Sequence, residues 1–175
     1  KKVNWIQQRL NINDNHPDFS LDQKKHILKK LNQAVSFESF LHTKYVGQKR
    51  FSLEGGESLI PAIDSLILAA DDLGVEEFVM GMAHRGRLST LANIFGKSTK
   101  DIFSEFDGKD YDEDVFDGDV KYHMGWTSKI DPNKDGKKIN ISLAPNPSHL
   151  ETVGAVVQGI ARAKLENSYS SDTSK

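Results

Sequence analysis

The alternation of hydrophobic and polar positions predicts a strand followed by a helix in the middle of the chain. Residues 76–82, EEFVMGM, form a short apolar run that is typical of a buried strand. Before this run, a wide apolar stripe predicts a helix over residues 59–73, with Pro61 in its first turn and Gly74 just beyond its end. After it, apolar spacing predicts a second helix with an inward face at Leu88, Leu91, Ala92 and Phe95.

A second strand–helix pair follows further along the chain. The stretch INISLAP, residues 139–145, alternates and is rich in β-branched side chains, which favours a strand. Residues 147–165 then predict a helix, and Ser148 and Glu151 have the spacing of a capping box. Because strands and helices alternate, we expect an α/β domain.

The first 50 residues are mostly polar and have helical patterning. Residues 20–35 predict a helix that begins with Ser20 and Gln23 in capping-box spacing. Its predicted apolar face consists of Ile27, Leu28, Leu31 and Val35. The stretch SFESFLHTKYVG, residues 36–47, predicts a second short helix.

These patterns divide the chain into three parts. We expect a helical lead-in over residues 1–47, an α/β unit over residues 48–166, and a disordered or linker tail over residues 167–175, which has no apolar anchor. The acidic run DGKDYDEDVFDGD, residues 107–119, lacks the ligand order of an EF-hand, so we expect a mobile loop there instead of a calcium site.

Composition excludes several classes of function. The net charge of −2 gives no general attraction to nucleic acid or to an acidic membrane surface. Cysteine is absent, so disulfides and thiolate metal sites are excluded. No apolar run is long enough to span a membrane, and the start of the chain does not resemble a signal peptide. A first residue of Lys instead of Met suggests a trimmed or truncated chain.

Polar clusters follow both predicted strands, at the position where open α/β sheets bind their ligands. After the first strand, Arg85 can donate two N–H groups to one anion, and Gly86 lets the backbone approach a ligand. His84 can donate to a carboxylate or move a proton near neutral pH. For a single arginine, an ion pair with one of the many acids is the better explanation, but the cluster as a whole at a strand end favours an anion site slightly.

Two further positions carry candidate chemistry. Ser148 begins the last predicted helix, where free N–H groups favour phosphate or carboxylate, although a well-capped helix start explains it too. His123 lies between Tyr122 and Met124, a setting that is more typical of a core or surface histidine. As a third polar cluster, however, it could help to hold a dicarboxylate and a phosphate. The sequence contains no Walker or G-x-G-x-x-G loop and no metal-ligand spacing.

Four motifs together resemble one known family. KRFSLEGGESLIP, GMAHRGRLSTLANIFGK, GDVKYHMGWTS and APNPSHLETVGAVVQGIARAKL resemble, in the same order, the first part of the thiamine-diphosphate domain of the 2-oxoglutarate dehydrogenase E1 family. The resemblance covers roughly residues 45–166, and the lead-in resembles the family more weakly. It implies a partial thiamine-diphosphate-binding fold, with a mainly parallel sheet flanked by helices.

The resemblance implies an activity and its partners. Members of the family use thiamine diphosphate and magnesium to decarboxylate 2-oxoglutarate, and they transfer the succinyl group to the lipoyl group of the E2 dihydrolipoyl succinyltransferase. It implies a homodimer for the full-length protein, located in the bacterial cytoplasm or, in a eukaryote, in the mitochondrial matrix. The G-D-A motif that binds the metal diphosphate does not occur in the sequence, so we expect the metal ligands outside this fragment and no turnover by the fragment alone.

The matching motifs also imply roles for individual residues. His84 and His123 would be catalytic and bind the 2-oxo acid, and Thr127 could contact the substrate. Arg85, Ser148 and Leu150 would line the cofactor site, and no metal ligand is expected within the chain. Arg87 has no role in this scheme, and we expect it to form a structural ion pair. Two alternatives stay open: a 2-oxoadipate dehydrogenase E1, and a non-catalytic module that binds anions or partners.

Overall fold

A computed structural model describes residues 1–12, 16–107, 123–146 and 149–169. Within these ranges the chain forms six helices and three strands. They are, in order, α1 (Lys2–Asn11), α2 (Leu21–Lys44), α3 (Leu59–Asp72), β1 (Glu77–Met80), α4 (Arg87–Asn93), α5 (Thr99–Asp107), β2 (Trp126–Ile130), β3 (Ile139–Leu143) and α6 (Leu150–Tyr169). The α/β class predicted from the alternation is confirmed.

The three strands form one mixed sheet in the order β1–β3–β2. β1 is parallel to β3, with Phe78 opposite Ile141, and β2 is antiparallel to β3, with Ser128 opposite the same residue. The sequence did not predict β2, whose mixed polar and apolar residues give only a weak strand signal. Because of these directions, the carboxyl ends of β1 and β3 meet the amino end of β2 at one edge of the sheet.

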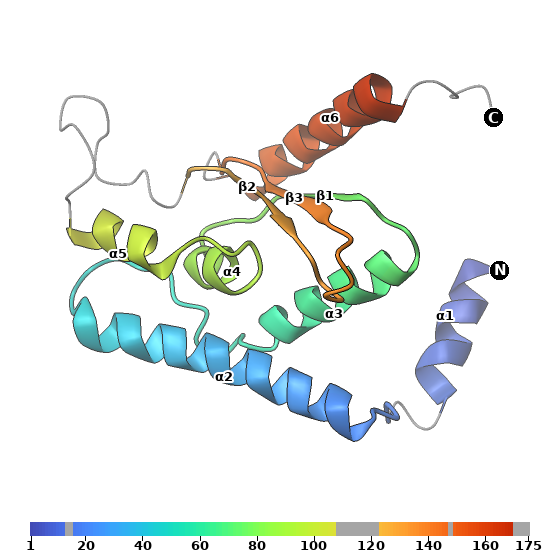
Figure 1. Cartoon of the computed structure of the whole chain (residues 1–175), viewed down its shortest axis with the longest axis horizontal. Helices are drawn as coiled ribbons and strands as arrows, with labels where there is room; N and C mark the ends of the chain where they lie inside the picture. Colours follow the sequence, from blue (N-terminus) through green and yellow to red (C-terminus); the bar gives the residue numbers. More distant parts are fainter. Residues whose placement is uncertain (13–15, 108–122, 147–148, 170–175) are drawn as a thin grey trace.

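Helices cover both faces of the sheet (Figure 1). α6 lies over one face against β1, and α3 and α4 lie under the other face with α2 outside them. Gly81, just after β1, permits the close approach of α6, since a Cβ atom there would lie 2.2 Å from Cγ1 of Val153. The main core lies on the α3 and α4 side and includes Ile60, Leu91, Phe95, Ile139 and Ile141.

α2 is a single helix where the sequence predicted two. Its predicted capping box is confirmed, with Ser20 Oγ accepting from Gln23 N at 3.2 Å and Gln23 Oε1 accepting from Ser20 N at 2.9 Å. The predicted apolar face is wrong at Leu28 and Val35, which are exposed. The buried positions are Ala34, Phe37, Glu38 and Leu41, and their spacing carries one helical face across the predicted break.

The other helices agree with the sequence patterns in most respects. Pro61 lies in the first turn of α3, and Gly74 ends this helix with φ +79° and a hydrogen bond to the carbonyl of Asp71. α6 continues to Tyr169, which is three residues into the predicted tail. The acidic run is described only as far as Asp107, so the loop predicted there lies outside the described residues. No helix in the described part of the chain is long and apolar enough to cross a membrane.

Candidate active site

Three chain segments meet at the edge where β1 and β3 end and β2 begins. They are residues 81–87, residues 123–125 and the segment that follows β3. Backbone hydrogen bonds tie them together: Ala144 N donates to the carbonyl of Met80 at 2.8 Å, and Asn146 N donates to that of His123 at 2.9 Å. The strand order therefore brings the turn after β1, the residues before β2 and the segment after β3, as far as Asn146, to one place.

Arg87 connects all three segments from inside the protein. Its Nη1 donates to the carbonyl of Met82 at 3.3 Å, and its Nη2 donates to the carbonyls of Met124 at 2.7 Å and Ala144 at 2.8 Å. The residue is 0% exposed. One side chain thus fixes the relative position of three loops that are far apart in the sequence.

The ion pair predicted for Arg87 is wrong. Among the described residues its guanidinium is bonded to carbonyl oxygens and to no carboxylate. The physical reason is that the segments after β1, before β2 and after β3 direct the carbonyls of Met82, Met124 and Ala144 at the same point, and their partial negative charges together replace an acid. Burial lowers the pKa of Arg87 to about 10, so the side chain stays protonated at neutral pH.

The two predicted histidines face each other at this edge. Nε2 of His84 lies 2.9 Å from Nε2 of His123, and the ring centroids are 5.0 Å apart. Both side chains are half-buried. A hydrogen bond between two ring nitrogens needs one donor and one acceptor, so the pair shares a single proton at this contact. Protonating both nitrogens would place two N–H groups and two charges face to face.

Phe51 packs against His84 and was missed by the sequence analysis. The two rings are stacked, with their centroids 4.6 Å apart. Phe51 has φ +43°, a conformation that bulky residues rarely adopt, and its carbonyl accepts a hydrogen bond from Gly86 N at 2.9 Å. In the sequence, Phe51 is visible only as an aromatic residue inside the motif KRFSLEGG. No pattern predicted which residue it would pack against.

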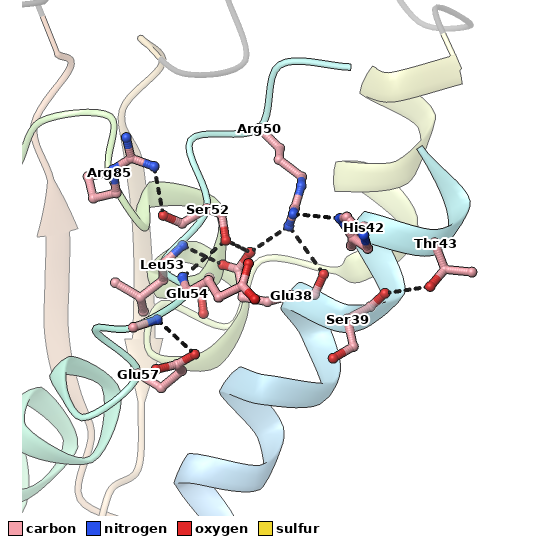
Figure 2. A network of polar contacts seen from close by, with 12 residues as sticks. Glu38, Ser39, His42, Thr43, Arg50, Ser52, Leu53, Glu54, Glu57 and Arg85 are labelled. Atoms are coloured by element: carbon pink, nitrogen blue, oxygen red, sulfur yellow. Dashed lines mark hydrogen bonds and ion pairs between the residues drawn. The ribbon is translucent and has the colours of Figure 1, made fainter. Parts of the chain in front are cut away.

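Arg85 lies at the surface of the same turn. Its Nη1 donates to the carbonyl of Ser52 at 3.0 Å, which uses one of its two terminal nitrogens (Figure 2). The next residue must be glycine: Gly86 has φ +73°, and a Cβ atom there would lie 2.5 Å from Cδ1 of Leu53. The turn is therefore packed closely against residues 51–53 while the guanidinium stays exposed.

The remaining predicted site residues are not joined to the histidine pair by a hydrogen bond in the described part of the chain. Thr127 Oγ1 donates to Ser142 Oγ at 3.3 Å on the sheet face that is turned away from the main core. Leu150 is 61% exposed as the first residue of α6, and Ser148 lies outside the described residues. Their contacts with substrate or cofactor stay predictions.

Comparison with known proteins decides the family. No family model matches the chain. The chain is 56% identical over 162 residues to the 2-oxoglutarate dehydrogenase E1 component of Cupriavidus necator, a match that covers 93% of this chain and 17% of that protein. It is 49% identical over 164 residues to proteins of the same name from Brucella canis and Brucella suis, covering 93% of this chain and 16% of each.

The chain belongs to the 2-oxoglutarate dehydrogenase E1 family. The matches cover 93% of this chain, so the family resemblance found in the four motifs is confirmed. The chain spans about a sixth of the length of the curated relatives that it matches.

The residues of this E1 chain fit thiamine diphosphate as one side of a site. Arg85 is exposed and has a terminal nitrogen left to donate to a phosphate oxygen, and Leu150 offers an exposed apolar side chain near the same edge. The described residues contain no group of three or more His, Asp and Glu side chains that could hold a metal ion.

Proposed function

We propose that this chain forms part of the active site of a thiamine-diphosphate-dependent E1 component that decarboxylates 2-oxoglutarate and passes the succinyl group to the lipoyl group of E2. The observation that carries the proposal is the identity of 49–56% to proteins named 2-oxoglutarate dehydrogenase E1 component. The arrangement of His84 and His123 at the strand-end edge supports it, because this is the edge of an α/β sheet where ligands bind.

In this proposal the histidine pair binds and orients the 2-oxo acid. The carboxylate and keto oxygens of such a substrate are hydrogen-bond acceptors, and the pair already holds one N–H at the contact between its Nε2 atoms. A substrate oxygen that accepts this N–H replaces the partner histidine as acceptor. The partner imidazole no longer accepts at this contact and can serve as the group that moves a proton.

The proposal also assigns residues to the cofactor. Arg85 binds the diphosphate through its exposed guanidinium, and Ser148 and Leu150 line the cofactor at the start of α6. Thiamine diphosphate, when bound, supplies the carbon nucleophile for the keto carbon and accepts the electrons left by departing CO2. The magnesium that accompanies it takes its ligands from residues other than those described.

The family also suggests partners and a location. We propose that the complete protein is a homodimer that works with E2 in a multienzyme complex. The named relatives come from bacteria, which favours the cytoplasm over the mitochondrial matrix.

The proposal is tested by measuring CO2 release from 2-oxoglutarate and from 2-oxoadipate by the complete E1 protein with thiamine diphosphate and magnesium. We expect faster turnover of 2-oxoglutarate, and we expect His84→Ala to lower kcat/KM about 100-fold or more. His16→Ala, which changes an exposed histidine outside the site, is the matched control. Equal activity of the two variants would favour a non-catalytic module, and faster turnover of 2-oxoadipate would favour the other dehydrogenase.

We also propose that this 175-residue chain alone has no steady turnover. The described residues supply one side of the site and no metal-ligand cluster, so they do not suffice to hold the metal diphosphate. Steady CO2 release by the isolated chain with thiamine diphosphate, magnesium and 2-oxoglutarate would contradict this.

A further inference from the structure

Glu38 is a buried acid on α2, and its carboxylate binds the segment that leads into the site (Figure 2). The residue is 6% exposed. Its Oε2 accepts from Arg50 Nη1 at 3.1 Å and from Ser52 Oγ at 2.8 Å, and its Oε1 accepts from Leu53 N at 3.0 Å. All three donors come from residues 50–53, so one carboxylate fixes this short segment on the helix.

The same segment is bonded on its other side to the turn that carries His84. The carbonyl of Phe51 accepts from Gly86 N at 2.9 Å, and the carbonyl of Ser52 accepts from Arg85 Nη1 at 3.0 Å. Residues 50–53 therefore lie between α2 and the predicted active-site turn and are hydrogen-bonded to both.

Phe51 lies in the middle of this segment, and the two sets of hydrogen bonds restrain its backbone conformation. Its φ of +43° is unfavourable for a bulky side chain and persists only where the surroundings hold it. The hydrogen bonds of its neighbours to Glu38 provide this restraint. In this conformation the Phe51 ring stacks on His84, whose Nε2 faces His123.

We propose that Glu38 is a positioning residue of the active site: its carboxylate holds Phe51 in the left-handed conformation against His84 and so fixes this imidazole opposite His123. The inference rests on the proposed function for its effect on turnover. A glutamine at this position has the same shape, but its amide has one acceptor oxygen where the carboxylate has two, so its nitrogen would face either the donors of Arg50 and Ser52 or the N–H of Leu53. Glu38→Gln therefore removes one of the two acceptors and weakens the restraint with little change in volume.

The experiment compares Glu38→Gln with Glu54→Gln in the complete E1 protein. Glu54 is an exposed glutamate next to the same segment, so the control makes the same chemical change nearby. We expect Glu38→Gln to lower kcat/KM for 2-oxoglutarate about tenfold, because small displacements of reacting groups are costly, and Glu54→Gln to leave it within about twofold. In a His84→Ala background, Glu38→Gln should have no further effect, whereas a role in general stability would lower activity in both backgrounds. Equal kcat/KM for the two glutamine variants, or an undiminished loss in the His84→Ala background, would overturn the inference.

A crystal structure of Glu38→Gln gives a readout that does not depend on turnover. We expect Phe51 to leave the left-handed region and the Nε2 atoms of His84 and His123 to move beyond hydrogen-bond distance; an unchanged Phe51 and histidine pair would overturn the inference. If the unaltered protein does not decarboxylate 2-oxoglutarate, the proposed function fails while this structural test still decides the role of Glu38. If Glu38→Gln does not fold, Ser52→Ala removes one donor and keeps the carboxylate, and the same displacement is expected in its structure; no displacement would again overturn the inference.

Discussion

His84 and His123 share a hydrogen bond between their Nε2 atoms, 2.9 Å apart, although 39 residues separate them in the sequence. Neither residue reaches the other through its own local structure. His84 follows β1, His123 precedes β2, and the two strands lie on opposite sides of β3. The contact is therefore a product of the sheet topology and of the groups that hold the loops at its edge, and the predictions below test those groups.

Arg87 is the strongest of these groups, and its removal should destabilise the fold. Arg87→Met keeps the apolar stem of the side chain but removes the guanidinium that donates to the carbonyls of Met82, Met124 and Ala144, of which the bond to Ala144 is buried. We expect a loss of about 3–5 kcal/mol in the free energy of unfolding, measured by urea denaturation.

Arg162→Met is the matched control for this change. Arg162 is exposed on α6 and forms a surface ion pair with Glu166, four residues away, so its loss should cost less than about 0.5 kcal/mol. Equal effects of the two variants would mean that the buried guanidinium does not hold the three loops.

The contact between Gly81 and α6 predicts a second effect with its own rescue. In Gly81→Ala the new Cβ atom would overlap Cγ1 of Val153 and Cγ2 of Val157, which should lower the free energy of unfolding by about 1–3 kcal/mol. Adding Val153→Ala removes the closer overlap and should recover part of the loss. Gly154→Ala, where a Cβ atom meets no neighbour within 4 Å, should cost little. A double variant that is less stable than either single one would contradict the packing described here.

Gly86 and Gly47 separate the effect of backbone conformation from that of packing. Both have positive φ, of +73° and +78°, so alanine at either position should cost about 1 kcal/mol in stability. Only Gly86→Ala also brings a Cβ atom within 2.5 Å of Leu53 Cδ1. We expect the additional destabilisation and a fall in kcat/KM for Gly86→Ala alone, in thermal unfolding and decarboxylation assays of the complete E1 protein.

Local sequence patterns sufficed to predict the main elements and the position of His84. The strand Glu77–Met80 is a short apolar run, and the cluster after it lies where an α/β sheet binds its ligands. β2 was missed because its residues, WTSKI, have strongly apolar side chains only at the two ends and three polar residues between them, so the sequence shows no clear alternation of apolar and polar positions. His123 was grouped with His84 only as a third polar cluster and through the family resemblance; without β2, their direct contact could not be predicted.

The supporting residues could not be predicted because their partners are distant in the sequence. Arg87 donates to backbone carbonyls 37 and 57 residues away. Every residue has such a carbonyl, so the sequence does not indicate which one will accept the bond. Glu38 lies in a stretch that is mostly polar, and its partners begin 12 residues later in a segment without regular structure. In both cases the position of the residue depends on hydrogen bonds between segments that are distant in the sequence.

The measurement that tests the central claim most directly is a double-mutant cycle on His84 and His123 in the complete E1 protein, with kcat/KM for 2-oxoglutarate as the readout. If the two imidazoles act as a pair that shares one proton, each alanine variant should lose about 100-fold or more, and the double variant should lose little beyond the larger single effect. Losses that multiply in the double variant would show that the histidines act independently. Full activity of the double variant would contradict the assignment of this sheet edge as the active site.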